Sequence, residues 1–142
     1  MTGAIKICTV FLAAAALLWS LPAGGAGASP GPALEAGAAW LRLIDAGEYA
    51  GAWDAAAPYF QNAIKKPKWV HALEAARKPL GKMISRKLSS QEPKNSIPGA
   101  PDGQYTVLIF NTSFERKRAG RELLTLALGP DKRWRTVGYF IR

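Results

Sequence analysis

The sequence has little of the side-chain chemistry on which metal sites and many active sites depend. It contains one cysteine, Cys8, and one histidine, His71. Beyond Cys8 the chain can therefore form no disulfide, thiol nucleophile or thiolate metal site, and no zinc or haem site is expected. The ten Asp and Glu residues are scattered rather than clustered, which argues against a calcium site. The sequence predicts neither a metal nor a cofactor.

Motifs of the common enzyme classes are also missing. A Ser-His-Asp site needs a histidine as proton relay. His71 lies about 200° from Trp69 around the predicted helix, away from its apolar stripe, which is typical of a surface histidine. The chain has no G-x-S-x-G sequence, no P-loop and no glycine motif for dinucleotides that opens a helix.

The apolar run from Ile7 to Leu21 is too short to cross a bilayer core, which takes roughly twenty residues. Lys6 precedes it, and Ala26-Gly27-Ala28 follows as an A-x-A cleavage sequence. This order predicts a cleaved secretory signal peptide over residues 1–28 and one domain over residues 29–142. The domain would then be periplasmic or secreted. A retained membrane anchor is the alternative.

Positive charge is in excess: the chain carries +9, and loss of Lys6 with the leader would leave +8. The densest basic segment comprises Arg116, Lys117, Arg118 and Arg121. Outside the cytoplasm its partners would be anionic lipid headgroups, lipopolysaccharide or acidic polymers, and no cytosolic nucleic acid is expected. Acidic residues interrupt the basic ones, so the alternative is that these charges form ordinary solvated surfaces.

Apolar periodicity predicts three helices followed by four strands. The helices are expected at 33–46, at 49–64 with a kink at Pro58, and from Pro67 to just before Gly81; the strands are expected at 83–91, 104–114, 121–128 and 133–141, with a turn at 115–120. This order indicates an α+β domain. Its helices would pack on one face of a curved antiparallel meander sheet and enclose an apolar, cone-shaped interior.

Two charged residues fall on apolar strand faces. Arg86 alternates with Ile84 and Leu88 in the first strand, and Glu122 shares a face with leucines of the third strand. An unpaired buried charge is very costly, so we expect Arg86 and Glu122 to meet across the concave sheet. Such a pair would fix the sheet register. Alternatively, Arg86 would bind an anionic group in a pocket, or the face assignment is mistaken.

The aromatic residues of the second helix offer walls for such a pocket. Tyr49 and Trp53 belong to a stripe that steps by three or four residues, a spacing typical of core packing. If the cone is incompletely filled, these two side chains would line its mouth. Tyr49, Trp53, Arg86 and Glu122 are therefore the candidate pocket residues.

Three groups of residues make the chain resemble a known family. They are Trp40-Leu41-x-Leu43-Ile44-Asp45-x-Gly47-x-Tyr49-x-x-x-Trp53-x-x-Ala56-Ala57-x-x-Phe60; Trp69 with Arg77-x-Pro79-Leu80-Gly81 and Arg86; and Pro98-Gly99-x-Pro101-Asp102-Gly103-x-Tyr105 with Gly138-Tyr139-Phe140-Ile141. They resemble the exported bacterial family called domain of unknown function 4019. The resemblance implies a bacterial envelope protein with a small cystatin-like or nuclear-transport-factor-two-like domain, and it implies no activity.

These observations favour a non-enzymatic binding module for a small anionic ligand or an envelope protein partner. Two alternatives remain open. One is a hydrolase or isomerase-like enzyme that uses a carboxylate and a tyrosine inside the cone. The other is a surface binder of anionic lipid or polymer, with peripheral contact to a membrane.

Overall fold

The computed structural model describes residues 31–142 of the chain. The predicted signal peptide, residues 1–28, lies outside the described residues, and so does Cys8. Among residues 31–142 no helix is both long and apolar enough to span a membrane. The described residues form the expected α+β arrangement of helices followed by strands.

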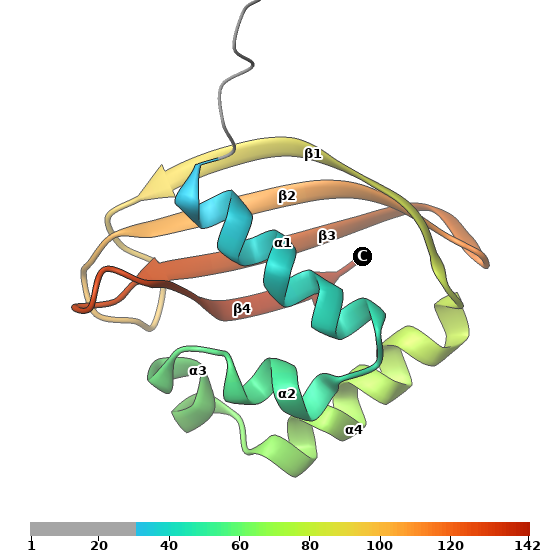
Figure 1. The fold of residues 1–142 in the computed structure, drawn as a ribbon, viewed down its shortest axis with the longest axis horizontal. Helices are drawn as coiled ribbons and strands as arrows, with labels where there is room; N and C mark the ends of the chain where they lie inside the picture. Colours follow the sequence, from blue (N-terminus) through green and yellow to red (C-terminus); the bar gives the residue numbers. More distant parts are fainter. Residues whose placement is uncertain (1–30) are drawn as a thin grey trace, which may run out of the picture.

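The strands form one antiparallel meander sheet in which neighbours in sequence are neighbours in space. They are β1 (Met83–Lys94), β2 (Tyr105–Phe114), β3 (Lys117–Leu128) and β4 (Trp134–Ile141). The sheet is strongly curved (Figure 1). The turn between β2 and β3 is shorter than the predicted 115–120, because Phe114 already pairs with Lys117.

The described helices are α1 (Pro32–Asp45), α2 (Tyr49–Asp54), α3 (Pro58–Ala63) and α4 (Lys66–Arg77), followed by a 3-10 turn, η1 (Lys78–Leu80). Proline opens α1 and α3, where its missing N–H has no helical partner to lose. Gly47 follows α1 with φ +75°, a conformation that glycine adopts without a side-chain clash. Helix α1 crosses one face of the sheet, and α2 to α4 lie beyond its β4 side (Figure 1).

The second predicted helix is two helices in the structure, so the described chain has four α-helices where the sequence predicted three. Pro58 begins α3 instead of kinking a continuous helix. A residue before proline avoids the helical region, and Ala57 is extended, with φ −65° and ψ 151°. The N–H of Ala57 donates to the carbonyl of Thr136 on β4 at 2.9 Å instead of to a helical carbonyl. The break thus ties the helices to the sheet edge.

Leucine and isoleucine side chains fill the space between α1 and the inner face of the sheet. Those that are at most 1% exposed are Leu41, Ile44, Leu108, Leu124 and Leu126. Gly37 lets α1 come this close, because a Cβ there would lie 2.8 Å from Leu108 Cδ1 and 3.0 Å from Leu124 Cδ2. The interior of the predicted cone is therefore packed with side chains along α1.

Aromatic side chains close the rest of the core. Trp69 packs edge-on against Phe60 at 4.9 Å between ring centroids, and Trp40 packs against Tyr139 at 5.4 Å. The indole N–H of Trp40 donates to the carbonyl of Ala52 at 2.8 Å, so its polar atom is satisfied inside the core. These contacts join α1, α2, α3 and α4 to the sheet.

The predicted apolar faces are wrong at two positions. Ile84 is 63% exposed, because the register of β1 against β2 shifts between Met83 and Ser85. The spacing of Trp69, Leu73 and Ala76 also predicts Ala76 on the buried face of the third helix, with Arg77 at its C-terminal end, where a cation complements the helix dipole. In α4 Ala76 is exposed instead, and Arg77 occupies the buried position one turn after Leu73.

Candidate functional site

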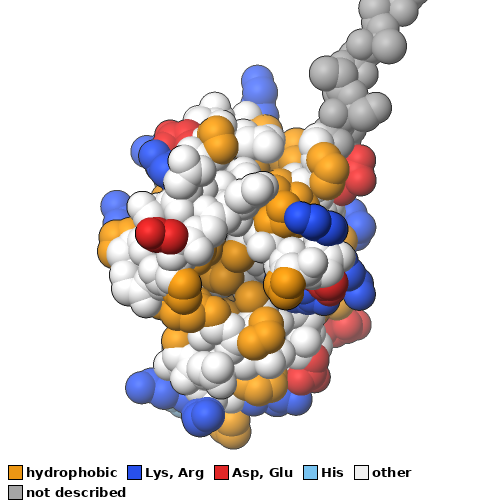
Figure 2. All heavy atoms as spheres, turned by 90° about the vertical axis from the view of Figure 1, so that its left-hand side faces the viewer, with side chains coloured by type: hydrophobic (Ala, Val, Ile, Leu, Met, Phe, Trp, Pro, Cys, Tyr) orange, Lys and Arg blue, Asp and Glu red, His pale blue; other side chains and the backbone are white. Residues whose placement is uncertain are grey.

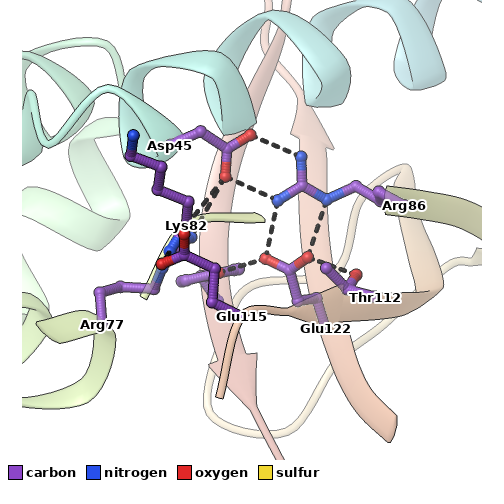
Figure 3. Close-up of polar contacts among 8 residues, drawn as sticks. Asp45, Arg77, Lys82, Arg86, Thr112, Glu115 and Glu122 are labelled. Atoms are coloured by element: carbon purple, nitrogen blue, oxygen red, sulfur yellow. Dashed lines mark hydrogen bonds and ion pairs between the residues drawn. The ribbon is translucent and has the colours of Figure 1, made fainter. Parts of the chain in front are cut away.

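The structure brings Arg86 and Glu122 together on the inner face of the sheet. Arg86 lies opposite Thr112, and Glu122 lies opposite Phe110, so β2 runs between the two charged residues. Arg86 Nε donates to Glu122 Oε1 at 2.7 Å, and Nη2 donates to Oε2 at 3.1 Å. This is the bidentate geometry in which a guanidinium and a carboxylate bind most strongly (Figure 3).

Asp45 is the third member of this cluster, and the sequence analysis did not identify it. It is the last residue of α1 and reaches the other edge of the guanidinium, with Arg86 Nη1 to Oδ2 at 2.7 Å and Nη2 to Oδ1 at 2.9 Å. A carboxylate at the C-terminal end of a helix opposes the helix dipole. That unfavourable position is the sequence signal that could have marked Asp45 as a paired residue.

Arg77 supplies a second cation from α4. Its Nη1 and Nη2 both donate to Asp45 Oδ1 at 3.2 Å, and its guanidinium lies 4.9 Å from the ring centroid of Phe114. Arg77 is 5% exposed, so both contacts are shielded from water. The cluster therefore joins α1, α4, β1 and β3 through two cations and two carboxylates.

Glu122 is fully buried, and each side of its carboxylate is hydrogen-bonded. Thr112 Oγ1 donates to Oε1 at 2.5 Å, and the hydroxyl of Tyr139 donates to Oε2. With the two bonds from Arg86, the carboxylate accepts from three side chains on three strands. We call Asp45, Arg77, Arg86, Thr112, Glu122 and Tyr139 the inner cluster.

The electrostatics of the inner cluster favour the charged forms of Asp45 and Arg86 and the neutral form of Tyr139. Burial raises the pKa of Asp45, but hydrogen bonds and charge from Arg86, with charge from Arg77, outweigh it and leave that pKa below its usual value. Burial lowers the pKa of Arg86, and the bonds to Asp45 and Glu122 more than reverse this. Burial, together with the charge of Glu122, holds the pKa of Tyr139 well above its usual value.

This geometry suits a structural cluster better than a reactive one. Arg86 uses four of its five N–H groups on Asp45 and Glu122. The Glu122 carboxylate has no exposed surface, and the Arg86 side chain is 12% exposed. A ligand would have to displace an internal carboxylate before it could bind Arg86.

Tyr49 and Trp53 do not line one pocket with Arg86 and Glu122. Tyr49 lies on the rim of a surface depression of about 360 Å³, beside Asp45 and Arg77. The indole N–H of Trp53 donates to the carbonyl of Ile64 at 2.8 Å, and Lys66 Nζ sits 5.1 Å from the centroid of its ring. Trp53 therefore helps to hold α2, α3 and the start of α4 together.

The four candidate basic residues divide between the two sides of the β2–β3 turn. Arg116 faces the helices, where its Nη1 donates to the carbonyl of Lys78 at 3.1 Å. Lys117 pairs with Phe114 at the turn itself. Arg118 and Arg121 line a depression of about 480 Å³ on the solvent-facing side of the sheet. The basic segment is therefore two surfaces, and only one of them is on the open sheet face.

Lys87 joins Arg118 and Arg121 at this depression. Lys87 and Arg121 both lie opposite Asn111, on the face of the sheet away from Phe110 and Thr112. The remaining lining residues are neutral: Ser85, Asn111, Thr112, Ser113, Ala119 and Gly120. None of the ion pairs found in residues 31–142 involves Lys87, Arg118 or Arg121. We call these three residues the outer basic patch.

Residues 31–142 hold no group of three or more His, Cys, Asp or Glu side chains that could bind an ion. His71 is exposed on α4, as its position in the helix predicted.

Comparison with known proteins gives a family but no activity. A solved structure from Catenulispora acidiphila is 15% identical, over 76% of this chain and 86% of that one, with a TM-score of 0.45. No curated protein matches this chain. The family model described as "Protein of unknown function (DUF4019)" matches residues 36–139, which include α2 to α4, β1 to β3 and most of α1 and β4. The chain therefore belongs to the DUF4019 family of proteins of unknown function.

Proposed function

We propose that this protein is a non-enzymatic binding domain that holds a small anionic ligand on the solvent-facing side of its sheet. The observation that carries the proposal is the division of its positive charges. Arg77 and Arg86 are occupied by internal carboxylates, whereas the outer basic patch surrounds a depression without an acidic lining residue. An anion placed there would meet three cations and no competing carboxylate.

The residues around the depression suit an anion with several oxygens. Lys87 and Arg121 flank Asn111 on neighbouring strands, and the lining also includes Ser85 and Ser113. Guanidinium groups bind carboxylate and phosphate oxygens in pairs, and serine and asparagine can donate further hydrogen bonds. Because β-strands position the backbone of these residues, only their side chains would have to be ordered on binding.

An anionic lipid or polymer surface is the second candidate, and Phe140 is the observation that favours it. Phe140 is 63% exposed and lies opposite Leu123, on the same sheet face as Arg121. A basic patch beside an exposed aromatic ring is the combination that peripheral membrane contact uses.

The geometry of the inner cluster argues against the enzymatic alternative. The carboxylate and tyrosine that an enzyme of this shape would need are present as Glu122 and Tyr139, and they bond to each other. A general base must exchange protons with a substrate. Glu122 is fully buried, and its bonds to Arg86 and Thr112 occupy the carboxylate.

Two finer features belong to the same proposal. The curvature of the sheet, with helices on one face, is what a cystatin-like or nuclear-transport-factor-two-like cone would have (Figure 1). The order of Lys6, the apolar run and the A-x-A sequence supports export with cleavage after residue 28. Export would bring the outer basic patch into contact with the anions of the cell envelope.

Calorimetric titration with pyrophosphate tests the proposal. The triple variant Lys87→Gln, Arg118→Gln, Arg121→Gln should bind at least about tenfold more weakly, because exposed charge pairs of about 0.5 kcal/mol each sum to about 1.5 kcal/mol. The matched control removes three exposed cations elsewhere: Arg42→Gln, Lys65→Gln, Lys68→Gln. Equal losses in the two triple variants would mean that only net charge matters and would refute a specific patch.

Vesicles that contain phosphatidylglycerol separate the second candidate from the first. Surface binding should weaken steeply as salt rises and should also weaken in Phe140→Ser. Pyrophosphate binding should be unaffected by Phe140→Ser.

A further inference from the structure

A further cavity, of about 510 Å³, lies between α1 and β4, on the other side of the sheet from the outer basic patch. Its volume falls in the range typical of small-molecule sites, about 300–1,000 Å³. Figure 2 shows this side of the molecule hollowed, with hydrophobic side chains inside the hollow. We call this cavity the α1–β4 groove.

The groove has an apolar interior made from two elements. Small side chains of α1, Ala36 and Ala39, form one wall together with Leu43, and Trp134 of β4 forms the other. Trp40 and Leu126 also line the cavity, and they are 4% and 0% exposed. An apolar body would therefore replace water against hydrocarbon and indole surfaces, which is favourable.

The charged residues at the rim leave one cation without a carboxylate. Arg135 binds Asp131 with both Nη groups, at 2.9 and 2.7 Å, and Asp54 pairs with Lys66 at 2.6 Å. Arg133 lines the groove too, is exposed, and takes part in none of the ion pairs of residues 31–142. Its charge contributes, after the bond from Arg135, to the lowered pKa of Asp131, but its guanidinium has no carboxylate at ion-pair distance and can take an anion.

The β3–β4 turn fixes the backbone of Arg133. Its N–H donates to Asp131 Oδ1 at 3.2 Å, and its carbonyl accepts from Gly129 at 2.9 Å, so the β3–β4 turn holds the residue in place. Thr136, another lining residue, is 1% exposed, and its Oγ1 has no hydrogen-bond partner in the described structure. A buried hydroxyl without a partner is unusual in proteins, and a polar ligand atom could satisfy it.

We propose that the α1–β4 groove binds a small amphipathic carboxylate. Its apolar body lies between the alanines of α1 and Trp134, and its carboxylate pairs with the guanidinium of Arg133. A single guanidinium fork matches a single planar carboxylate, which it binds through two parallel hydrogen bonds. The body is an alkyl chain or an aromatic ring, two sources of the same chemistry. This site shares no residue with the outer basic patch, so either proposal can fail alone.

Calorimetry on the purified protein with decanoate, 4-phenylbutyrate and decanol tests this site. Decanoate or phenylbutyrate should bind, and the tighter of the two identifies the body as chain or ring. Arg133→Gln should weaken the carboxylate at least about tenfold and leave decanol, which has no charge, within about twofold. Ala39→Trp fills the groove and should abolish binding of all three compounds.

Arg118→Gln, on the opposite side of the sheet, removes the same charge and serves as the control. It should leave decanoate binding unchanged. The proposal is overturned if neither carboxylate binds, if Arg133→Gln and Arg118→Gln have equal effects, or if Ala39→Trp folds and still binds decanoate. Circular dichroism of Ala39→Trp establishes that it folds, and Ala36→Phe fills the groove from the same helix if it does not.

Discussion

Replacing Arg86 by methionine should destabilise this domain far more than the loss of a surface charge would. Glu122 would stay fully buried and lose its cationic partner, although Thr112 and the hydroxyl of Tyr139 would still donate to it. Removal of one partner from a buried ion pair costs about 3–5 kcal/mol. That is a large fraction of the roughly 5–15 kcal/mol by which most domains are stable.

The loss should be partly recovered when the buried charge is removed as well. Glu122→Gln alone leaves Arg86 paired with Asp45, so we expect a cost of about 1–2 kcal/mol, near that of one charged hydrogen bond. In the double variant no unpaired charge remains inside. Its cost should therefore fall short of the sum of the two single costs by about 2 kcal/mol.

Urea unfolding followed by tryptophan fluorescence measures these differences. With a slope near 1.5 kcal/mol/M, Arg86→Met should lower the midpoint by about 2–3 M without changing the slope. If Arg86→Met does not fold, Arg86→Lys gives an intermediate loss, because lysine keeps the charge but lacks the planar fork. A loss below about 0.5 kcal/mol for Arg86→Met, or additivity within about 0.5 kcal/mol, would mean that Arg86 does not neutralise a buried charge on Glu122.

Two further predictions concern acid stability and helix packing. The pKa of Asp45 is lowered in the folded protein, so this carboxylate stabilises the fold fully above its unfolded pKa near 4 and loses that effect as pH falls through its folded pKa. The melting temperature of Asp45→Asn should therefore be lower than that of wild type at pH 7. It should also depend less on pH between about 5 and 2. Gly37→Val should lower the free energy of unfolding by about 1–3 kcal/mol, because even a Cβ added at this position would lie 2.8 Å from Leu108 Cδ1. Ala39→Val, on the exposed side of α1, should change the free energy of unfolding by less than about 1 kcal/mol. Equal melting temperatures for Gly37→Val and Ala39→Val would contradict the close approach of α1 to the sheet.

Most of the fold could be predicted from sequence because its signals are local. Alternating residues in β2 and the turn prolines and glycines around it depend only on neighbours in the chain. The predictions were wrong where contacts between distant parts of the chain determine the local structure. Whether Pro58 kinks a helix or starts a new one depends on the carbonyl of Thr136, which lies far away in sequence and accepts from Ala57. Ile84 is exposed because of a register shift that pairing with β2 sets.

The sequence predicted one ion pair of the candidate site and missed the other two charged residues. Arg86 and Glu122 could be matched because each is one charge on an apolar strand face, and an unpaired buried charge is costly. Asp45 and Arg77 were missed because both lie at helix ends, where a charged residue usually faces solvent. Only the packing of α1 on the sheet and of α4 against α2 brings them to within 3.2 Å of each other.

If the internal charges serve the fold and the anionic ligand binds the outer basic patch, an NMR titration with pyrophosphate should separate the arginines by their Nε–H signals. The signals of Arg118 and Arg121 should shift with increasing ligand, while that of Arg86, bonded to Glu122, stays in place. A saturable shift of the Arg86 signal with no change at Arg118 and Arg121 would instead mean that the anion binds at the inner cluster and not at the outer basic patch.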